Sequence, residues 1–148
     1  MNLVPLADLE LRYTSLASVG YGPGGQLYGT MEGWLKGEEL RGQLQLTNLA
    51  SMRPDNVNLP TLRGLLTTDD GASIYVEING IATLRTADQA RVFVTSMTFR
   101  TGEPRYAWLN TLFGLLEGVL DSVTVGGLAL GRVYRCEPTI RMPEPGPD

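Results

Sequence analysis

The segment 61–79 holds two apolar runs on either side of a short turn. Gly71, which follows two aspartates, can adopt the positive φ that a tight hairpin turn requires. After the turn, Ile74, Val76 and Ile78 alternate with polar or amphipathic residues. Because successive side chains of a strand leave on opposite faces, this alternation places the three aliphatic residues on one side. The segment is therefore predicted to form a β-hairpin with one face in the core.

Comparable short runs recur along the chain at a spacing of roughly ten residues, with turn residues between them, which is typical of an all-β barrel. In the first run, Leu9, Leu11 and Tyr13 alternate with polar residues, and the last run, 128–136, can pair with it and close the sheet. We therefore predict one all-β domain over residues 1–137, a single antiparallel β-barrel. The proline-rich segment 138–148 is predicted to be a flexible tail.

The segment 109–125 fits two kinds of structure. Leu109, Leu112 and Leu116 suit one face of a helix, whereas Gly114 and Gly118 weaken a helical assignment. Both alternatives stay open from the residues alone.

The run 91–100 is bulky on both of its faces. Phe93, Met97 and Phe99 share one face, and Val92 and Val94 occupy the other. If the lumen takes one set, the other forms an apolar patch outside the barrel. We therefore expect a homodimer or higher homo-oligomer. In the competing account, the segment 109–120 is a helix that covers the patch and leaves a monomer.

Residue usage excludes several kinds of chemistry. The chain has no histidine and one cysteine, Cys136, so Ser-His-Asp and Cys-His relays and most transition-metal sites are ruled out. A carboxylate-only site for a hard cation stays open, but the chain has no calcium-loop spacing. We expect no metal and no cofactor.

Charge and hydrophobicity bear on partners and location. A net charge of −4 argues against nucleic-acid binding, and 43% hydrophobic with 19% charged residues is ordinary for a soluble globular protein. The chain has no apolar stretch of membrane-spanning length and no secretory signal pattern, so no membrane partner is expected. A cytoplasmic location is predicted.

An aromatic strip follows the break at 101–104. Tyr106, Trp108 and Asn110 crowd two large rings and an amide into five positions, which can line or close a pocket. The alternative is a plug at the end of the barrel. Arg41 is predicted to lie near this strip and to bind an anionic or carbonyl group. A position on the exterior, where its charge is simply solvated, is the alternative for Arg41.

Several short blocks carry a resemblance to a known family. They are Arg53-Pro54-Asp55, the hairpin 68–76 with Gly80, the segment 99–102, the strip Tyr106-Ala107-Trp108-Leu109-Asn110, and Gly131-Arg132-Val133-Tyr134. In these blocks the chain resembles a family of small bacterial and fungal proteins, catalogued mainly as a domain of unknown function with a lipocalin-like (calycin-type) β-barrel. The resemblance favours strands over the segment 109–125. It departs after Leu40-Arg41-Gly42, where relatives carry a Gly-rich stretch with an Asp-Trp pair.

Function is then predicted from the lumen of such a barrel. The first hypothesis is a lipocalin-like barrel that binds a small, largely apolar or aromatic molecule in its cavity. The candidate ligand-binding residues are Arg41, Tyr75, Glu77, Phe99, Tyr106, Trp108, Asn110 and Tyr134. The second hypothesis is a cofactor-free isomerase, cyclase or lyase of secondary metabolism that uses a cavity carboxylate or tyrosine as acid or base. A purely structural or dimeric accessory protein is the third.

Overall fold

A computed structural model describes residues 1–147. Its elements are β1 (Asn2–Tyr21), β2 (Gly24–Lys36), β3 (Arg41–Asn48), β4 (Ser51–Met52), β5 (Asn58–Leu59), β6 (Thr61–Thr68), β7 (Ser73–Arg85), β8 (Ala90–Arg100), the 3₁₀ helix η1 (Pro104–Thr111), β9 (Gly114–Leu120) and β10 (Leu128–Glu137).

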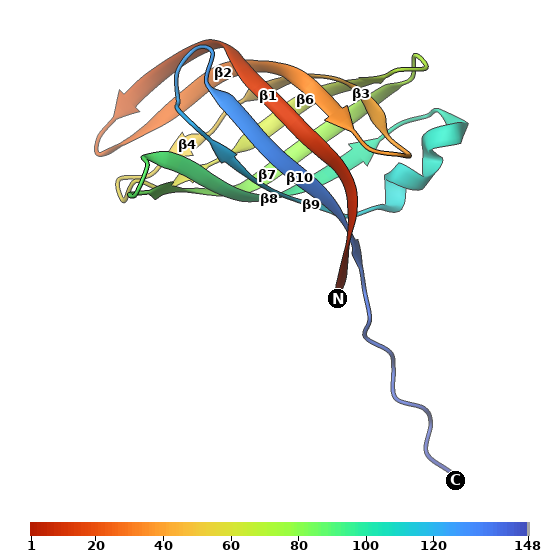
Figure 1. Ribbon diagram of the computed structural model, residues 1–148. Helices are drawn as coiled ribbons and strands as arrows, with labels where there is room; N and C mark the ends of the chain where they lie inside the picture. The colour runs from red at the N-terminus through yellow and green to blue at the C-terminus, as the bar shows by residue number, and fades with distance from the viewer. Residues whose placement is uncertain (148) are drawn as a thin grey trace.

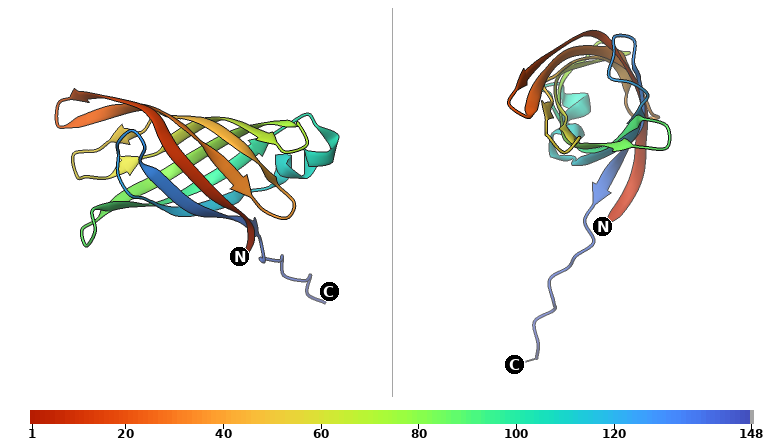
Figure 2. Two further views of the ribbon diagram at one scale, coloured as in Figure 1. Left: turned by 45° about the horizontal axis from the view of Figure 1, so that its top comes forward. Right: turned by 90° about the vertical axis from the view of Figure 1, so that its left-hand side faces the viewer.

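The long strands form one closed antiparallel ring. Around the ring the order is β1-β2-β3-β6-β7-β8-β9-β10, and β10 pairs again with β1. Figure 1 shows the strands wrapped around a common axis, and the end-on view in Figure 2 shows the ring. The short strands β4 and β5 bridge β2 and β7 at one end. The predicted all-β, single antiparallel barrel is confirmed.

Alternation along each strand sorts side chains between lumen and exterior. In β8, Thr95, Met97 and Phe99 are buried, whereas Val94 is exposed on the outer face. Gly118, on the neighbouring strand β9, is paired with Phe93, and a Cβ added there would lie 2.3 Å from the Phe93 ring. A glycine at this position therefore makes room for an aromatic ring inside the barrel.

The two ends of the barrel differ. The helix η1 covers one end, where Leu109 is fully buried and Tyr106 and Trp108 pack against the core. At the opposite end the β1–β2 hairpin projects beyond the ring (Figure 1). The segment 109–125 is thus divided between the last turn of η1 and strand β9. Residues 109–120 do not form a helix over the outer face of β8.

The chain leaves the barrel after β10. Residues 138–147 belong to no helix or strand and extend away from the ring (Figure 1). The predicted tail ends at Asp148, which lies outside the described residues. Within residues 1–147, none of the helical structure is long and apolar enough to cross a membrane.

Candidate functional site: a pocket in the barrel lumen

The barrel lumen holds a pocket of about 60 Å³ at the end away from η1. The first half of β8 contributes Arg91, Phe93 and Thr95 to it, whereas η1 follows the other end of that strand. Most of the wall is aliphatic and comes from strands all around the ring. It includes Leu9, Leu11, Leu27, Leu62, Ile78 and Leu116. We call this space the lumen pocket.

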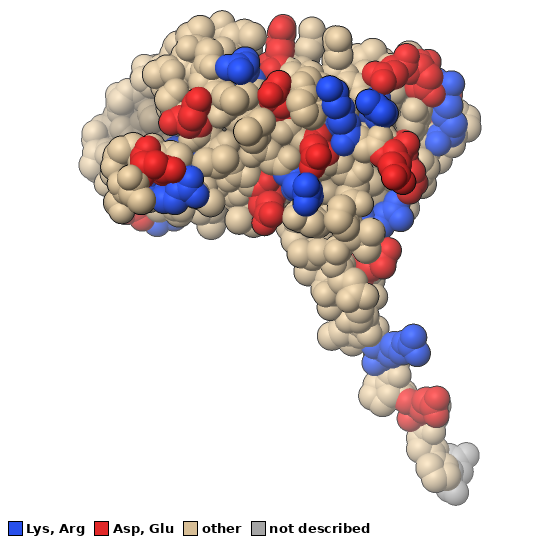
Figure 3. Space-filling view, in the orientation of Figure 1, with Lys and Arg blue, Asp and Glu red and all other residues tan. Residues whose placement is uncertain are grey.

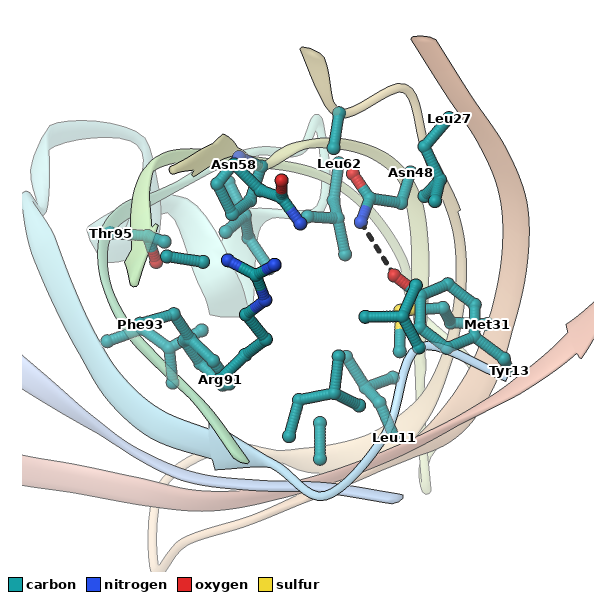
Figure 4. A pocket seen from close by; sticks show the side chains of 18 of the residues that line it. Leu11, Tyr13, Leu27, Met31, Asn48, Asn58, Leu62, Arg91, Phe93 and Thr95 are labelled. Carbon is teal, nitrogen blue, oxygen red and sulfur yellow. Dashed lines mark hydrogen bonds between the residues drawn. The ribbon is translucent and has the colours of Figure 1, made fainter. Parts of the chain in front are cut away.

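Tyr13 and Asn48 form a buried polar pair in the pocket wall (Figure 4). The Asn48 side-chain amide donates to the Tyr13 hydroxyl at 2.9 Å, and the Asn48 Oδ1 accepts the backbone N–H of Thr61 at 3.2 Å. Burial raises the pKa of Tyr13, and the Asn48 hydrogen bond opposes that shift in part. The phenol therefore keeps its proton, and this O–H donates to no acceptor among residues 1–147.

Thr95 places a second hydroxyl in the pocket wall. The residue is 3% exposed, and its Oγ1 has no hydrogen-bond partner among the described residues. A buried hydroxyl without a partner lowers stability, because it has given up its hydrogen bonds to water. Because the Oγ1 atom is itself buried, it offers no donor on the open surface of the pocket.

Arg91 brings a positive charge to the pocket mouth. Its half-buried side chain extends from β8 toward the middle of the opening, near Asn58 (Figure 4). The guanidinium donates to the backbone carbonyl of Asn56, in the loop between β4 and β5. None of the ion pairs formed within residues 1–147 includes Arg91. The lumen pocket therefore combines apolar walls with one cationic group at its opening.

Four of the eight residues predicted from sequence lie on the outer wall. Arg41 is exposed, and its Nε lies 4.0 Å from a carboxylate oxygen of Asp69. Tyr75 also faces outward, and its ring lies under the guanidinium of Arg100. The other two are Glu77, which pairs with Arg100 at 3.2 Å and Arg63 at 3.7 Å, and Tyr134, which donates to Glu117 at 3.0 Å.

The remaining four lie together at the closed end. Phe99 fills the lumen beneath η1, and the Trp108 ring lies 5.4 Å from the Arg135 guanidinium. Asn110 brackets Thr101 with hydrogen bonds of 2.8 and 2.9 Å to its backbone N–H and carbonyl. These are the contacts of a plug that is fastened to the end of the barrel.

Tyr106 completes the plug through Asp70. Its hydroxyl donates to Asp70 at 2.9 Å, and the Thr68 hydroxyl donates to the same oxygen at 2.5 Å. These two hydrogen bonds, that of Thr68 first, hold the pKa of Asp70 below its usual range. None of the eight residues predicted from sequence lines the lumen pocket.

The residues that do line the pocket carried a partial signal in the sequence. Tyr13 stands in the inward register of the first predicted strand, and Thr95 shares its face with Phe93 and Met97. Arg91 stands two residues before Phe93 and therefore on the same face of the strand. Asn48 gave no such signal, because it stands where β3 ends and the turn-rich connection begins.

An eight-stranded antiparallel ring with an apolar pocket inside defines a small β-barrel protein. Residues 1–115 match the family described as "Protein of unknown function (DUF3237)". The chain belongs to this family, which confirms the resemblance seen in the sequence. Among functionally curated proteins, no sequence matches this chain.

Solved structures share the fold at low sequence identity. A β-barrel-like protein from Acinetobacter baumannii AYE is 21% identical, with a TM-score of 0.78 over 90% of this chain and 94% of that chain. A conserved protein of unknown function from Rhodopseudomonas palustris is 22% identical, with a TM-score of 0.78 over 90% and 96%. An enzyme from Penicillium herquei is 19% identical, with a TM-score of 0.63 over 89% and 93%. At these identities the likeness establishes the fold.

Proposed function

We propose that the protein binds a small, largely apolar molecule in the lumen pocket. The observation that carries this proposal is the pairing of aliphatic walls with the Tyr13 hydroxyl. The Asn48 amide donates to this hydroxyl, whose O–H has no acceptor among residues 1–147 and is free to donate to a ligand. Ligand sites are usually apolar with a few polar groups that fix orientation, and this pocket has that composition.

The size of the pocket limits the ligand. Its 60 Å³ is well below the roughly 300–1,000 Å³ of sites for drug-sized compounds. It is also smaller than the roughly 150 Å³ apolar cavity that accepts benzene in an engineered protein. A ligand therefore has a narrow apolar body, and the rest of it lies in the open mouth beside Arg91.

Titration of the full chain with hexan-1-ol, followed by ¹H–¹⁵N correlation NMR, tests the proposal. Saturable shifts are expected at the amides of Tyr13, Thr95 and other pocket residues. Ala129 lines the pocket and is buried, so Ala129→Leu should fill the space and abolish the shifts. Ala17→Leu makes the same change at an exposed position of β1 and should bind like the natural chain. Equal titration of the two variants, or no saturation in the natural chain, refutes lumen binding.

Tyr13 favours a second function, cofactor-free acid catalysis in the same pocket. Its buried, protonated phenol can give a proton to a carbonyl oxygen while a water molecule takes the α-proton. Among the described residues no carboxylate lines the pocket, so we assign the role of general acid to Tyr13. The likeness to a fungal enzyme adds support at the level of the fold.

Exchange of the α-protons of the linear ketone hexan-2-one in D₂O tests this second function. If Tyr13 is the acid, the protein should accelerate exchange and Tyr13→Phe should remove the acceleration. Tyr28→Phe changes an exposed tyrosine and serves as the control. Exchange at the rate of buffer alone refutes catalysis by this route for simple ketones.

A further inference from the structure

We infer, on the basis of the lumen-binding function proposed above, that the natural ligand is a monoanion. It has a narrow apolar body that enters the lumen and one carboxylate, or an oxyanion of like charge, that stays at the mouth. Arg91 is the residue that selects it. Positive charge for an anionic group was expected from Arg41, but that side chain lies on the outer wall.

The charges around the mouth point to an anion. Of the acidic residues in the adjacent loops, Asp55 pairs with Arg53, and Asp88 pairs with Arg85 at 2.7 Å. The Asp121 carboxylate accepts hydrogen bonds from the Leu128 N–H and the Ser122 hydroxyl. Each of these carboxylates therefore has partners other than Arg91. Across the face shown in Figure 3, charges of both signs likewise lie side by side. Arg91 differs, because it is half-buried in the pocket wall and has no carboxylate partner within residues 1–147.

The donors of Arg91 suit a carboxylate. A guanidinium carries five N–H donors in a planar fork that matches the two oxygens of a carboxylate. The hydrogen bonds formed within residues 1–147 use one of these nitrogens, which donates to the Asn56 carbonyl. Figure 4 shows the guanidinium extended into the opening, near Asn58. A ligand carboxylate placed there gains charge-assisted hydrogen bonds without displacing a protein carboxylate.

The apolar body follows from the position of Arg91 on β8. Phe93 and Thr95 stand on the same face of the strand, deeper in the lumen. A ligand anchored at Arg91 therefore directs its chain along Phe93 toward the aliphatic wall. The pocket lining has no second cation, so one negative charge is matched and a second is not.

Hexanoate and hexan-1-ol share a six-carbon body and differ in charge, so together they test this inference by NMR titration. The natural chain should bind hexanoate roughly tenfold or more tightly than hexan-1-ol, as expected for a hydrogen bond to a charged group. Arg91→Met keeps a long apolar side chain and should bring the two affinities together. Arg91→Lys should retain part of the preference. Arg85→Met removes a charge beside the mouth but outside the pocket lining and should keep all of it.

The comparison in the natural chain separates the two proposals. If hexan-1-ol binds in the lumen and hexanoate binds no more tightly, lumen binding stands and the anionic ligand is refuted. A preference that survives in Arg91→Met, or that Arg85→Met removes equally, also overturns the role of Arg91. If neither compound shifts the pocket amides, lumen binding itself fails.

Discussion

The Asn48 side chain donates a hydrogen bond to the Tyr13 hydroxyl across 2.9 Å inside the barrel. Tyr13 belongs to β1 and Asn48 to β3, so the bond joins two strands that β2 separates in the ring. The Asn48 Oδ1 accepts from the N–H of Thr61, at the start of β6. One amide thus links the polar wall of the lumen pocket to three strands.

Tyr13→Phe is expected to destabilise the protein. The substitution removes the acceptor of the buried Asn48 amide, and a buried donor left without a partner costs about 1–3 kcal/mol. Urea unfolding of the variant against the natural chain measures the loss. Tyr28→Phe, at an exposed tyrosine, should leave the free energy of unfolding unchanged. Equal effects of the two substitutions would contradict a structural role for the Tyr13 hydroxyl.

The same tyrosine should make the barrel sensitive to alkali. Burial raises the pKa of Tyr13 above the ordinary value of 10.0, so the unfolded chain releases this proton at a lower pH than the folded chain. The stabilising contribution is complete below pH 10 and is lost as the pH rises through the folded pKa. Unfolding free energies measured at neutral and alkaline pH should fall more steeply in the natural chain than in Tyr13→Phe. Parallel profiles would argue against this assignment.

Thr95→Val should stabilise the protein. Valine has nearly the shape of threonine and removes a buried hydroxyl that has no partner among the described residues, which is worth about 1 kcal/mol or more. Thermal unfolding should show a higher midpoint. A lower melting midpoint would mean that the hydroxyl already has a partner.

Asp70→Ala should loosen η1 without opening the rest of the barrel. The change removes the acceptor of the Tyr106 and Thr68 hydroxyls. Amide hydrogen exchange should speed up at Leu112, whose N–H donates to the Leu109 carbonyl at the end of η1. Asp69→Ala alters the exposed neighbour and is the matched control. Because the pKa of Asp70 is lowered, its contribution is present above the usual aspartate value of 3.8 and is lost as the pH falls through the folded pKa.

Homo-oligomerisation remains a prediction, and a substitution that tests it has to leave the lumen intact. Phe99 and Leu116 face the lumen, so a glutamate at either position would disrupt the core. The outer apolar patch consists of Ile81 and Val94, which are paired across β7 and β8, and of Val92, Val119 and Leu130, which are in register across β8, β9 and β10. Ile81, Val94 and Leu130 are 51%, 57% and 47% exposed. We propose that this patch is covered in a homodimer. Light scattering should give the mass of two chains for the natural protein and of one chain for Val94→Glu, with Val19→Glu on the projecting hairpin as control. A single-chain mass for the natural protein would contradict the proposal.

The barrel could be predicted from sequence because strand alternation is local. The two-residue alternation that turns Ile74 inward and Tyr75 outward also turns Thr95 inward and Val94 outward. Each strand is long enough for this alternation to show which of its faces is buried. The division at residues 109–120 was harder, because Gly114 and Gly118 suit a crowded strand as well as a broken helix. Gly118 is needed because the Phe93 ring of the neighbouring strand occupies the space that a larger side chain would take.

The position of the pocket could not be obtained in this way. Large amphipathic residues such as Tyr106 and Trp108 suit both a ligand site and a plug, and the choice depends on which end of the ring η1 covers. The pairing of Tyr13 with Asn48 joins residues 35 positions apart through a fold that neither residue encodes alone. Arg91 stands out because it has no carboxylate partner within residues 1–147. Which charges surround it depends on how the loops at the pocket mouth fold, so the sequence alone could not predict this.

The seam between β1 and β10 pairs Asn2 with Glu137 and so joins the two ends of the ring. Closing it requires the most distant parts of the sequence to meet, which makes the closing step entropically costly and slow. During synthesis β10 leaves the ribosome after every other strand, and until then one edge of β1 has no neighbour to pair with. An unpaired edge can recruit the wrong strand, so the newly made chain is most prone to aggregation in this interval. Since Ala129 of β10 forms part of the pocket wall, the lumen pocket is complete only after this final pairing. If the pocket binds hexan-1-ol as proposed, the onset of that binding during refolding would report the rate of barrel closure.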